Sequence, residues 1–248
     1  MPAQPDNAPA SHEDGFPVTR WTVVFAARGA DDPAARRAMG QLCQDYWYPL
    51  YAYARRRGLS PHDAEDRTQD FFRALIENNS LEQVAPERGR LRAYFLAAMK
   101  SFIGREFEKQ AAEKRGGGRE IVSIDQEMAE QRLAAEPGNE KSPDVLFDQS
   151  WAYAVLDRAL KRLESWYGSL KRQTLFTEIR GFLTGSGESG YRDVAQRLKV
   201  SETALRAAIV QMRKRYRGMI EDEIHATVEN AAEAAEELAY LQKVLAGG

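Results

Sequence analysis

The side chains best suited to recognising another molecule lie on a predicted helix that begins near Glu202. Four of them recur at spacings of four, three and four residues and so share one helical face: Arg206, Val210, Arg213 and Arg217. A guanidinium can donate hydrogen bonds to a guanine edge or pair with a phosphate, and an aliphatic side chain can contact a thymine methyl group. The pattern predicts a helix face that enters the major groove of DNA.

Two short helices joined by a tight turn are needed to position this face. The neighbouring face of the second helix, one position round, is apolar at the same spacing, with Leu205, Ile209, Met212 and Tyr216. Residues 191–198 form the first helix, Val200 is expected to plug the turn, and Ser201 is expected to cap the second helix. This is the pattern of a helix-turn-helix. The alternative is a surface pair of helices whose cations are merely solvated.

The rest of the chain is predicted to be helical as well. Its 248 residues are 43% hydrophobic, which suffices for folded cores, and Ala, Leu, Glu and Arg are abundant. We expect an all-α protein of two small domains joined by a flexible linker, with the helix-turn-helix in the C-terminal domain. The single cysteine, Cys43, lies in a helical apolar pattern and should pack in a core, and no disulfide can form within the chain. Residues 1–15 contain no apolar run, so we expect no signal peptide, no membrane association and a cytoplasmic location.

Charge is distributed in blocks, although the whole chain is close to neutral. Residues 88–119 hold nine Arg and Lys against three Glu, and residues 192–217 hold eight against two acids. Residues 60–87 instead hold seven acids against two bases, and residues 221–248 hold seven acids against one lysine. Two basic surfaces for DNA and one acidic surface for a basic protein would give this pattern, as would a solvated helical bundle with uneven charge.

A helix boundary is predicted between Gly58 and Pro61. Gly58 ends one helix, in which Pro49 is expected to cause a bend, and Ser60 with Pro61 begins the next. On this next helix the spacing places one polar face outward, made of His62, Glu65, Asp66, Gln69 and Arg73. That face carries most of the acidic block.

Three blocks of sequence precede the helix-turn-helix in a set order. They are Tyr46-Trp-Tyr-Pro-Leu-Tyr-Ala-Tyr-Ala-Arg55, Asp63-Ala-Glu-Asp-Arg-Thr-Gln-Asp-Phe-Phe72 and Leu91-Arg-Ala-Tyr-Phe-Leu-Ala-Ala-Met-Lys100. Together with the helix-turn-helix, this order resembles an RNA polymerase sigma factor of the extracytoplasmic function (ECF) type. The resemblance implies a protein that binds core RNA polymerase, recognises promoter DNA and promotes strand opening for transcription initiation. It also leaves room for an anti-sigma protein as a partner.

The resemblance implies three sets of contact residues. Core polymerase would be contacted by Glu65, Asp66, Gln69 and Asp70. The minus-ten element, which needs cations for phosphates and aromatic surface for unstacked bases, would be contacted by Arg90, Arg92, Tyr94, Lys100, Arg105 and Lys109. At the minus-thirty-five element, base edges would be contacted by Glu202, Thr203, Arg206 and Val210, and phosphates by Arg213, Lys214 and Arg217.

The resemblance also implies a division of the chain. The predicted segments are a disordered N-terminal tail (1–18), sigma region 2 (19–115), a linker (116–141), sigma region 4 with the helix-turn-helix (142–220) and an acidic helical extension (221–248). The extension has no counterpart in a minimal sigma factor. It either covers a basic DNA-binding face as an internal inhibitor, or is solvated or contacts polymerase. Lys199 stands at a turn position where the family commonly has glycine, which asks a non-glycine residue for an unfavourable backbone conformation.

Other classes of function fit the sequence less well. Gly185-Ser-Gly-Glu-Ser-Gly190 matches the nucleotide-binding G-x-G-x-x-G pattern, but a helical pattern precedes it where that site requires a strand. The acids of residues 63–70 could suit a magnesium-dependent nuclease, but no second carboxylate helix is predicted to face them. The three histidines, His12, His62 and His225, lack metal-ligand spacing. We expect no enzyme activity, cofactor, metal or small-molecule substrate, and the alternative function is a free-standing helix-turn-helix regulator that does not bind core polymerase.

Overall fold

The computed structural model describes residues 33–77, 90–113, 124–135, 141–184, 190–228 and 230–247. Throughout this part of the chain the secondary structure is helical, without strands, which confirms the predicted all-α class. The helices are α2 (Pro33–Arg56), α3 (Pro61–Glu77), α4 (Leu91–Glu113), α5 (Ile124–Ala135), α6 (Pro143–Ser169), α7 (Gln173–Ile179), the 3-10 helix η3 (Arg180–Leu183), α8 (Tyr191–Leu198), α9 (Glu202–His225) and α10 (Ala231–Leu245). The predicted N-terminal tail lies outside the described residues.

The predicted boundary between the first two helices is confirmed. Helix α2 continues through Pro49 and ends at Arg56, and Gly58 follows with a φ of 94°, a conformation that residues with a Cβ rarely adopt. The hydroxyl oxygen of Ser60 then accepts a hydrogen bond from the backbone N–H of Asp63 at 3.1 Å, with Pro61 in the first position of α3. The cap and the glycine therefore set the turn that orients α3 against α2.

Aromatic side chains join α2, α3 and α4. Tyr46 of α2 stacks on Phe95 of α4 with 4.4 Å between ring centroids, and Phe71 of α3 lies edge-on to Phe95 at 6.2 Å. Both Tyr46 and Phe95 are buried. Such ring pairs add to the gain from burying their apolar area, so these three helices form one packed unit. Its hydrophobic cluster is called the α2–α4 cluster below.

A second hydrophobic cluster lies at the far end of the molecule. It is made by α7, η3, α8 and the adjoining ends of α6 and α9, and it contains Leu163, Phe176, Val194 and Ile209. This group is called the α7–α9 cluster below. Tyr167 of α6 stacks on Phe176 of α7 at 5.2 Å, which fixes the short α7 against the long α6.

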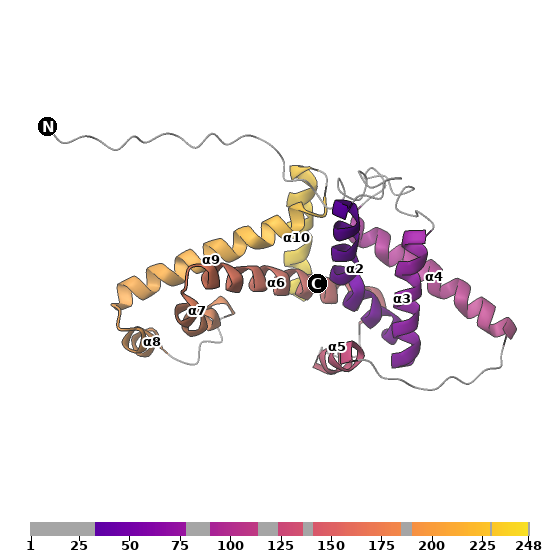
Figure 1. The fold of residues 1–248 in the computed structure, drawn as a ribbon, viewed down its shortest axis with the longest axis horizontal. Coiled ribbons are helices and arrows are strands. Elements are labelled where there is room, and N and C mark those ends of the chain that lie inside the picture. The colour runs from indigo at the N-terminus through magenta and orange to yellow at the C-terminus, as the bar shows by residue number, and fades with distance from the viewer. Residues whose placement is uncertain are drawn as a thin grey trace.

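Two long helices contribute to both clusters and lie side by side from the α7–α9 cluster to the middle of the molecule (Figure 1). Helix α6 buries Phe147 and Trp151 in the α2–α4 cluster and Leu163 in the α7–α9 cluster. Helix α9 begins in the α7–α9 cluster with Leu205 and buries Ile224 in the other. The two clusters therefore share helices, while the division into two domains with a flexible linker stays a prediction.

The middle of the predicted linker is helical. Helix α5 occupies residues 124–135, and its Glu130 accepts hydrogen bonds from the Tyr51 hydroxyl at 2.7 Å and from Arg55 Nε at 2.6 Å, both on α2. The Arg55 side chain lowers the pKa of the Glu130 carboxyl, which keeps this ion pair charged. This part of the predicted linker is attached to α2.

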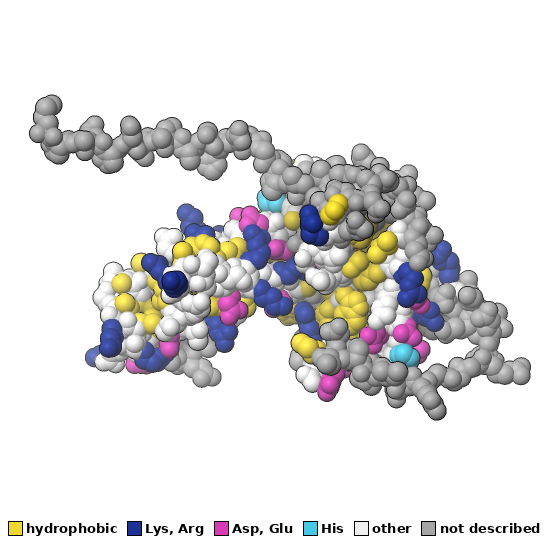
Figure 2. All heavy atoms as spheres, in the orientation of Figure 1, with side chains coloured by type: hydrophobic (Ala, Val, Ile, Leu, Met, Phe, Trp, Pro, Cys, Tyr) yellow, Lys and Arg dark blue, Asp and Glu magenta, His cyan; other side chains and the backbone are white. Residues whose placement is uncertain are grey.

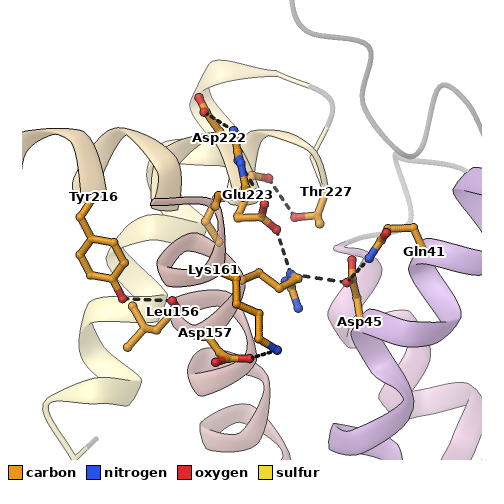
Figure 3. A network of polar contacts seen from close by, with 12 residues as sticks. Gln41, Asp45, Leu156, Asp157, Lys161, Tyr216, Asp222, Glu223 and Thr227 are labelled. Atoms are coloured by element: carbon orange, nitrogen blue, oxygen red, sulfur yellow. Dashed lines mark hydrogen bonds and ion pairs between the residues drawn. The ribbon is translucent and has the colours of Figure 1, made fainter. Parts of the chain in front are cut away.

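A buried ionic network connects α2, α6 and α9 at the centre of the molecule (Figure 3). The Arg158 Nε of α6 lies 2.8 Å from a carboxylate oxygen of Glu223 on α9 and 3.5 Å from one of Asp45 on α2. Asp45 and Glu223 are both buried, and Gln41 donates a further hydrogen bond to Asp45 at 2.9 Å. Buried charges are tolerated only when they are paired and hydrogen-bonded, so this network fixes the relative position of three helices.

Helix α10 turns back from the end of α9 and packs against both α9 and α6. Asn230 caps it, because the Asn230 side-chain oxygen accepts a hydrogen bond from the backbone N–H of Glu233 at 2.9 Å. Ala234 and Leu241 are its buried apolar residues and join the α2–α4 cluster. Among the described helices, none combines the length and the apolar character that crossing a membrane requires.

Candidate nucleic-acid interface

The turn between α8 and α9 is closed by backbone and cap hydrogen bonds. Lys199 has a φ of 54°, the left-handed conformation expected from the sequence for this non-glycine residue, and the Val200 N–H donates to the Ala195 carbonyl at 3.0 Å. The hydroxyl oxygen of Ser201 accepts a hydrogen bond from the Ala204 N–H at 3.1 Å, as predicted for the cap of the second helix.

The prediction for Val200 was wrong. Its side chain is 44% exposed, so it does not plug the turn. The left-handed Lys199 turns the chain so that Val200 faces outward, and the contact between the helices is made by Val194 and Ala195 of α8 with Leu205 of α9, all buried.

All seven predicted contact residues of α9 are exposed: Glu202, Thr203, Arg206, Val210, Arg213, Lys214 and Arg217. Val210 is 60% exposed, so its side chain is accessible to a base methyl group. Figure 2 shows Lys and Arg side chains spread over the lobe that α7, α8 and the adjoining ends of α6 and α9 form. The structure thus brings the predicted groups together on one accessible face.

Two of these arginines have contacts that the sequence did not indicate. The Arg206 guanidinium lies over the Tyr191 ring at 4.2 Å, and Tyr191 in turn stacks on Phe182 at 4.9 Å. Arg213 donates two hydrogen bonds, at 3.1 and 2.7 Å, to the backbone carbonyl of Phe182. Arg206 is therefore oriented by an aromatic stack, whereas Arg213 also holds the end of η3 against α9.

An open groove lies beside this face, between α6 and α9. It has a volume of about 690 Å³, and Trp166, Lys214 and Arg215 are among its lining residues. The Arg215 guanidinium lies 3.7 Å from the centre of the Trp166 ring. This cation–π pair extends the positive surface of α9 towards α6, and the sequence pattern did not reveal it because the two residues are distant along the chain.

The acidic face of α3 differs from the predicted one at Glu65. Asp66 and Gln69 are exposed, but Glu65 is only 7% exposed and accepts a hydrogen bond from the Gln69 amide at 3.2 Å. Asp70 lies 3.2 Å from Arg67 and 2.8 Å from Arg73, so it forms ion pairs within its own helix and remains 35% exposed. The expectation that Glu65 points outward was wrong, because helical spacing alone does not show which neighbours flank the edge of a polar face.

The predicted cations of α4, with Arg90 directly before it, are mostly paired with acids of later helices. Arg90 lies 2.6 Å from Glu236 and 3.1 Å from Glu237 of α10, and Lys100 pairs with Asp144 of α6. Arg105 is exposed, Tyr94 is half-buried, and the side chain of Lys109 lies outside the described residues. Burial raises the pKa of Tyr94, so its hydroxyl stays neutral.

Arg92 is the most enclosed of the predicted DNA contacts. Its side chain pairs with Asp148 of α6 and lies 3.0 Å from Glu237 of α10. The same guanidinium lies between two rings, 4.9 Å from the centre of Trp151 and 4.1 Å from that of Tyr240. Burial alone would lower the pKa of Arg92, but the carboxylates of Glu237 and Asp148 outweigh it, so the net shift is upward and the cation stays charged.

Sequence reasoning missed the residues that surround Arg92. The aromatic and acidic partners come from α6 and α10, and the hydrogen bonds from Arg92 span 56 residues to Asp148 and 145 to Glu237. The one signal in the sequence was the opposite net charge of two blocks, the acidic residues 221–248 and the basic residues 88–119. That signal indicates attraction between the blocks but not which pairs form.

Sites of other chemistry were also compared with the structure. Within the described part of the chain, no three His, Cys, Asp or Glu side chains converge as metal ligands would. Residues 185–189 of the glycine-rich motif lie outside that part, and Gly190 stands directly before α8. A shallow open pocket of about 450 Å³ lies between α2 and α5, with Cys43, Trp47 and Met128 among its lining residues.

Comparisons of the chain with known protein families, with curated proteins and with solved structures gave no match.

Proposed function

We propose that this chain is a sigma-type transcription initiation factor, which binds core RNA polymerase, recognises promoter DNA and promotes strand opening. The outer face of α9 carries the proposal, since Arg206, Val210 and Arg217 lie exposed in one row. A helix with this row can place hydrogen-bond donors and an apolar group at base edges in the major groove. The α8–α9 pair then acts as a helix-turn-helix.

The remaining sequence blocks support initiation over simple regulation. Their order resembles that of ECF-type sigma factors, and the acidic helix α3 exposes Asp66 and Gln69 towards a basic partner. Glu65 is buried, so we assign polymerase contact to Asp66, Gln69 and the part-exposed Asp70. The α4 helix supplies the cations for the minus-ten element.

Affinity purification with core RNA polymerase tests the first part of the proposal. The chain should co-elute with core enzyme at moderate salt, and Asp66→Lys should weaken this binding because it reverses the sign of an exposed docking residue. Glu164→Lys is the matched control, since it makes the same charge change at an exposed position of α6. A chain that binds DNA but never co-elutes with core polymerase would instead be a free-standing regulator.

Run-off transcription tests the second part. Core enzyme with the chain should start transcripts from a subset of a library of upstream regions, and Arg206→Ala should lose the preference for particular minus-thirty-five sequences. Because Arg206 donates to base edges in this proposal, its loss should relax specificity at one or two base positions. If wild type and Arg206→Ala started from the same promoters with equal strength, α9 would not read bases through this residue.

A further inference from the structure

Helix α10 occupies cations that the proposed function assigns to promoter DNA. Arg90 is paired with both Glu236 and Glu237, and Arg92 is paired with Glu237. Glu237 is only 2% exposed, so its carboxylate lies within the contact between α10 and α4. A phosphate that paired with these guanidinium groups in the same place would have to displace the carboxylates that lie there.

The chemistry of the contact matches what single-stranded DNA would bring. Two carboxylates of α10 lie where backbone phosphates would pair with Arg90, and the Tyr240 ring covers the guanidinium of Arg92 as an unstacked base could. Arg92 keeps a second partner, Asp148 of α6, so it would remain held in place without α10. Arg90 has only α10 carboxylates among its ion pairs in the described residues and would be released.

The contacts that attach α10 to the rest of the molecule are weak enough for a ligand to replace. Helix α10 has 15 residues and is too short to be stable in water without its packing contacts. Only Ala234 and Leu241 are fully buried among its apolar side chains, Leu238, Tyr240 and Val244 are half-buried against the α2–α4 cluster, and Glu236 is an exposed side chain at 68%. Segments with few buried apolar contacts open at a lower free energy than the core.

We propose that α10 is an autoinhibitory strap, which holds Arg90 and covers Arg92 in the free chain and leaves them when single-stranded DNA binds along α4. The proposal rests on the proposed function, because it concerns the same minus-ten surface. The strap makes opened promoter DNA compete with an internal acidic helix, so the free chain binds single strands weakly.

Binding of a fluorescein-labelled oligothymidylate to the full-length chain tests the strap. Glu236→Lys removes the exposed ion pair with Arg90 and should tighten binding by about threefold to fivefold, as expected for one surface pair. Glu164→Lys, with the same change in net charge on α6, should change the affinity by less than about twofold. In the Glu236→Lys background, Arg90→Ala should remove the gain, because the cation that has lost its Glu236 partner is then absent.

Hydrogen exchange gives a readout that needs no variant. Addition of the oligothymidylate to the wild-type chain should raise exchange in α10 and leave the centre of α9 protected. Equal gains in Glu236→Lys and Glu164→Lys, or unchanged exchange in α10 on DNA binding, would overturn the strap. Absence of oligothymidylate binding in every variant would overturn it as well, whereas failure to co-elute with core polymerase would overturn the proposed function alone.

Discussion

At the scale of single residues, the orientation of Arg206 depends on an aromatic stack that other helices supply. The Tyr191 ring lies under the guanidinium at 4.2 Å and is itself supported by Phe182. A side chain held in this way loses less freedom on binding than a solvated arginine, which has many rotamers. Tyr191 is therefore a positioning residue in the proposed recognition of DNA.

Replacement of Tyr191 measures this role. Tyr191→Leu should weaken binding to a duplex selected by the wild-type chain about twofold to fivefold, because an exposed cation–π contact contributes roughly 0.5–1 kcal/mol. Tyr191→Phe keeps the ring and should bind like the wild type. Fluorescence anisotropy gives the affinities, and a melting curve checks that both variants fold. Equal losses in the two variants would assign the effect to the hydroxyl group and contradict the stack.

Cys43 provides a test that depends on pH. Burial raises the pKa of its thiol from 9.0 to about 11, and it is the one cysteine of the chain. At pH 8 the folded protein should therefore hold about a hundredfold less thiolate than the unfolded chain and react correspondingly more slowly with a disulfide reagent. Because the pKa is raised in the folded state, the thiol contributes stability below about pH 9 that is lost as the pH rises towards 11. Similar reaction rates with and without urea would show that the thiol is not desolvated.

Sequence reasoning at this scale succeeded where the signal is local. The Ser60 and Ser201 caps and the left-handed Lys199 follow from residues within a few positions of each other. The burial of Glu65 and the enclosure of Arg92 did not follow, because the surroundings of a side chain depend on how helices pack. For the same reason, exposure of the α9 row was predictable from helical spacing, whereas the Tyr191 stack was not.

At the scale of helices, the ion pairs of Arg158 decide how α2, α6 and α9 meet. Glu223 is 5% exposed and Asp45 is 3% exposed, so removal of either carboxylate leaves the Arg158 cation, itself only 16% exposed, without one of its partners. Asp222, the neighbour of Glu223 on α9, is 61% exposed and pairs with Arg162 at 2.9 Å. The two adjacent acids offer a comparison between a buried and an exposed ion pair on one helix.

Urea unfolding of two alanine variants makes this comparison. Glu223→Ala should lower the free energy of unfolding by about 3 kcal/mol or more, as is typical when one partner of a buried pair is removed. Asp222→Ala should lower it by at most about 1 kcal/mol, because water already solvates that pair. The dependence of the unfolding free energy on urea concentration should match that of the wild type in both variants, so that a shift in midpoint reports a change in stability. Equal effects would mean that the Arg158 network is solvated and does not fix the three helices.

The positions at which helices start were more predictable from the sequence than the way in which the helices pack against each other. Pro61 opens α3 as expected from its Ser-Pro signal. Ser142 and Pro143 begin α6 in the same way, and the Ser142 hydroxyl accepts a hydrogen bond from the Val145 N–H at 3.4 Å. The acidic C-terminal segment was expected to be helical and is so in α10, but its seat against α4 and α6 depends on contacts between distant residues. Apolar periodicity shows which face a helix buries, and it does not show which partner covers that face.

At the scale of the whole molecule, α6 and α9 couple the two hydrophobic clusters. Each helix has buried residues in both, so the α7–α9 cluster cannot unfold without releasing part of the surface that α2 and α4 cover. Independent domains on a flexible linker would lack this coupling. We therefore expect one cooperative unfolding transition for the described helices other than α10.

Hydrogen exchange at increasing urea distinguishes the two cases, because peptides from α3 and α8 report on different clusters. Both peptides should lose protection at the same urea concentration. Phe176 is 2% exposed in the α7–α9 cluster, so Phe176→Ala leaves a cavity and should lower the free energy of unfolding by about 3–5 kcal/mol. Both peptides should then lose protection at the same, lower urea concentration. If only the α8 peptide shifted, the clusters would be separate domains. In that case the two clusters could move relative to each other and bind the two promoter elements in the sigma-type proposal. If both peptides shift together, core polymerase or promoter DNA must instead separate α6 from α2 before both promoter elements are bound at once.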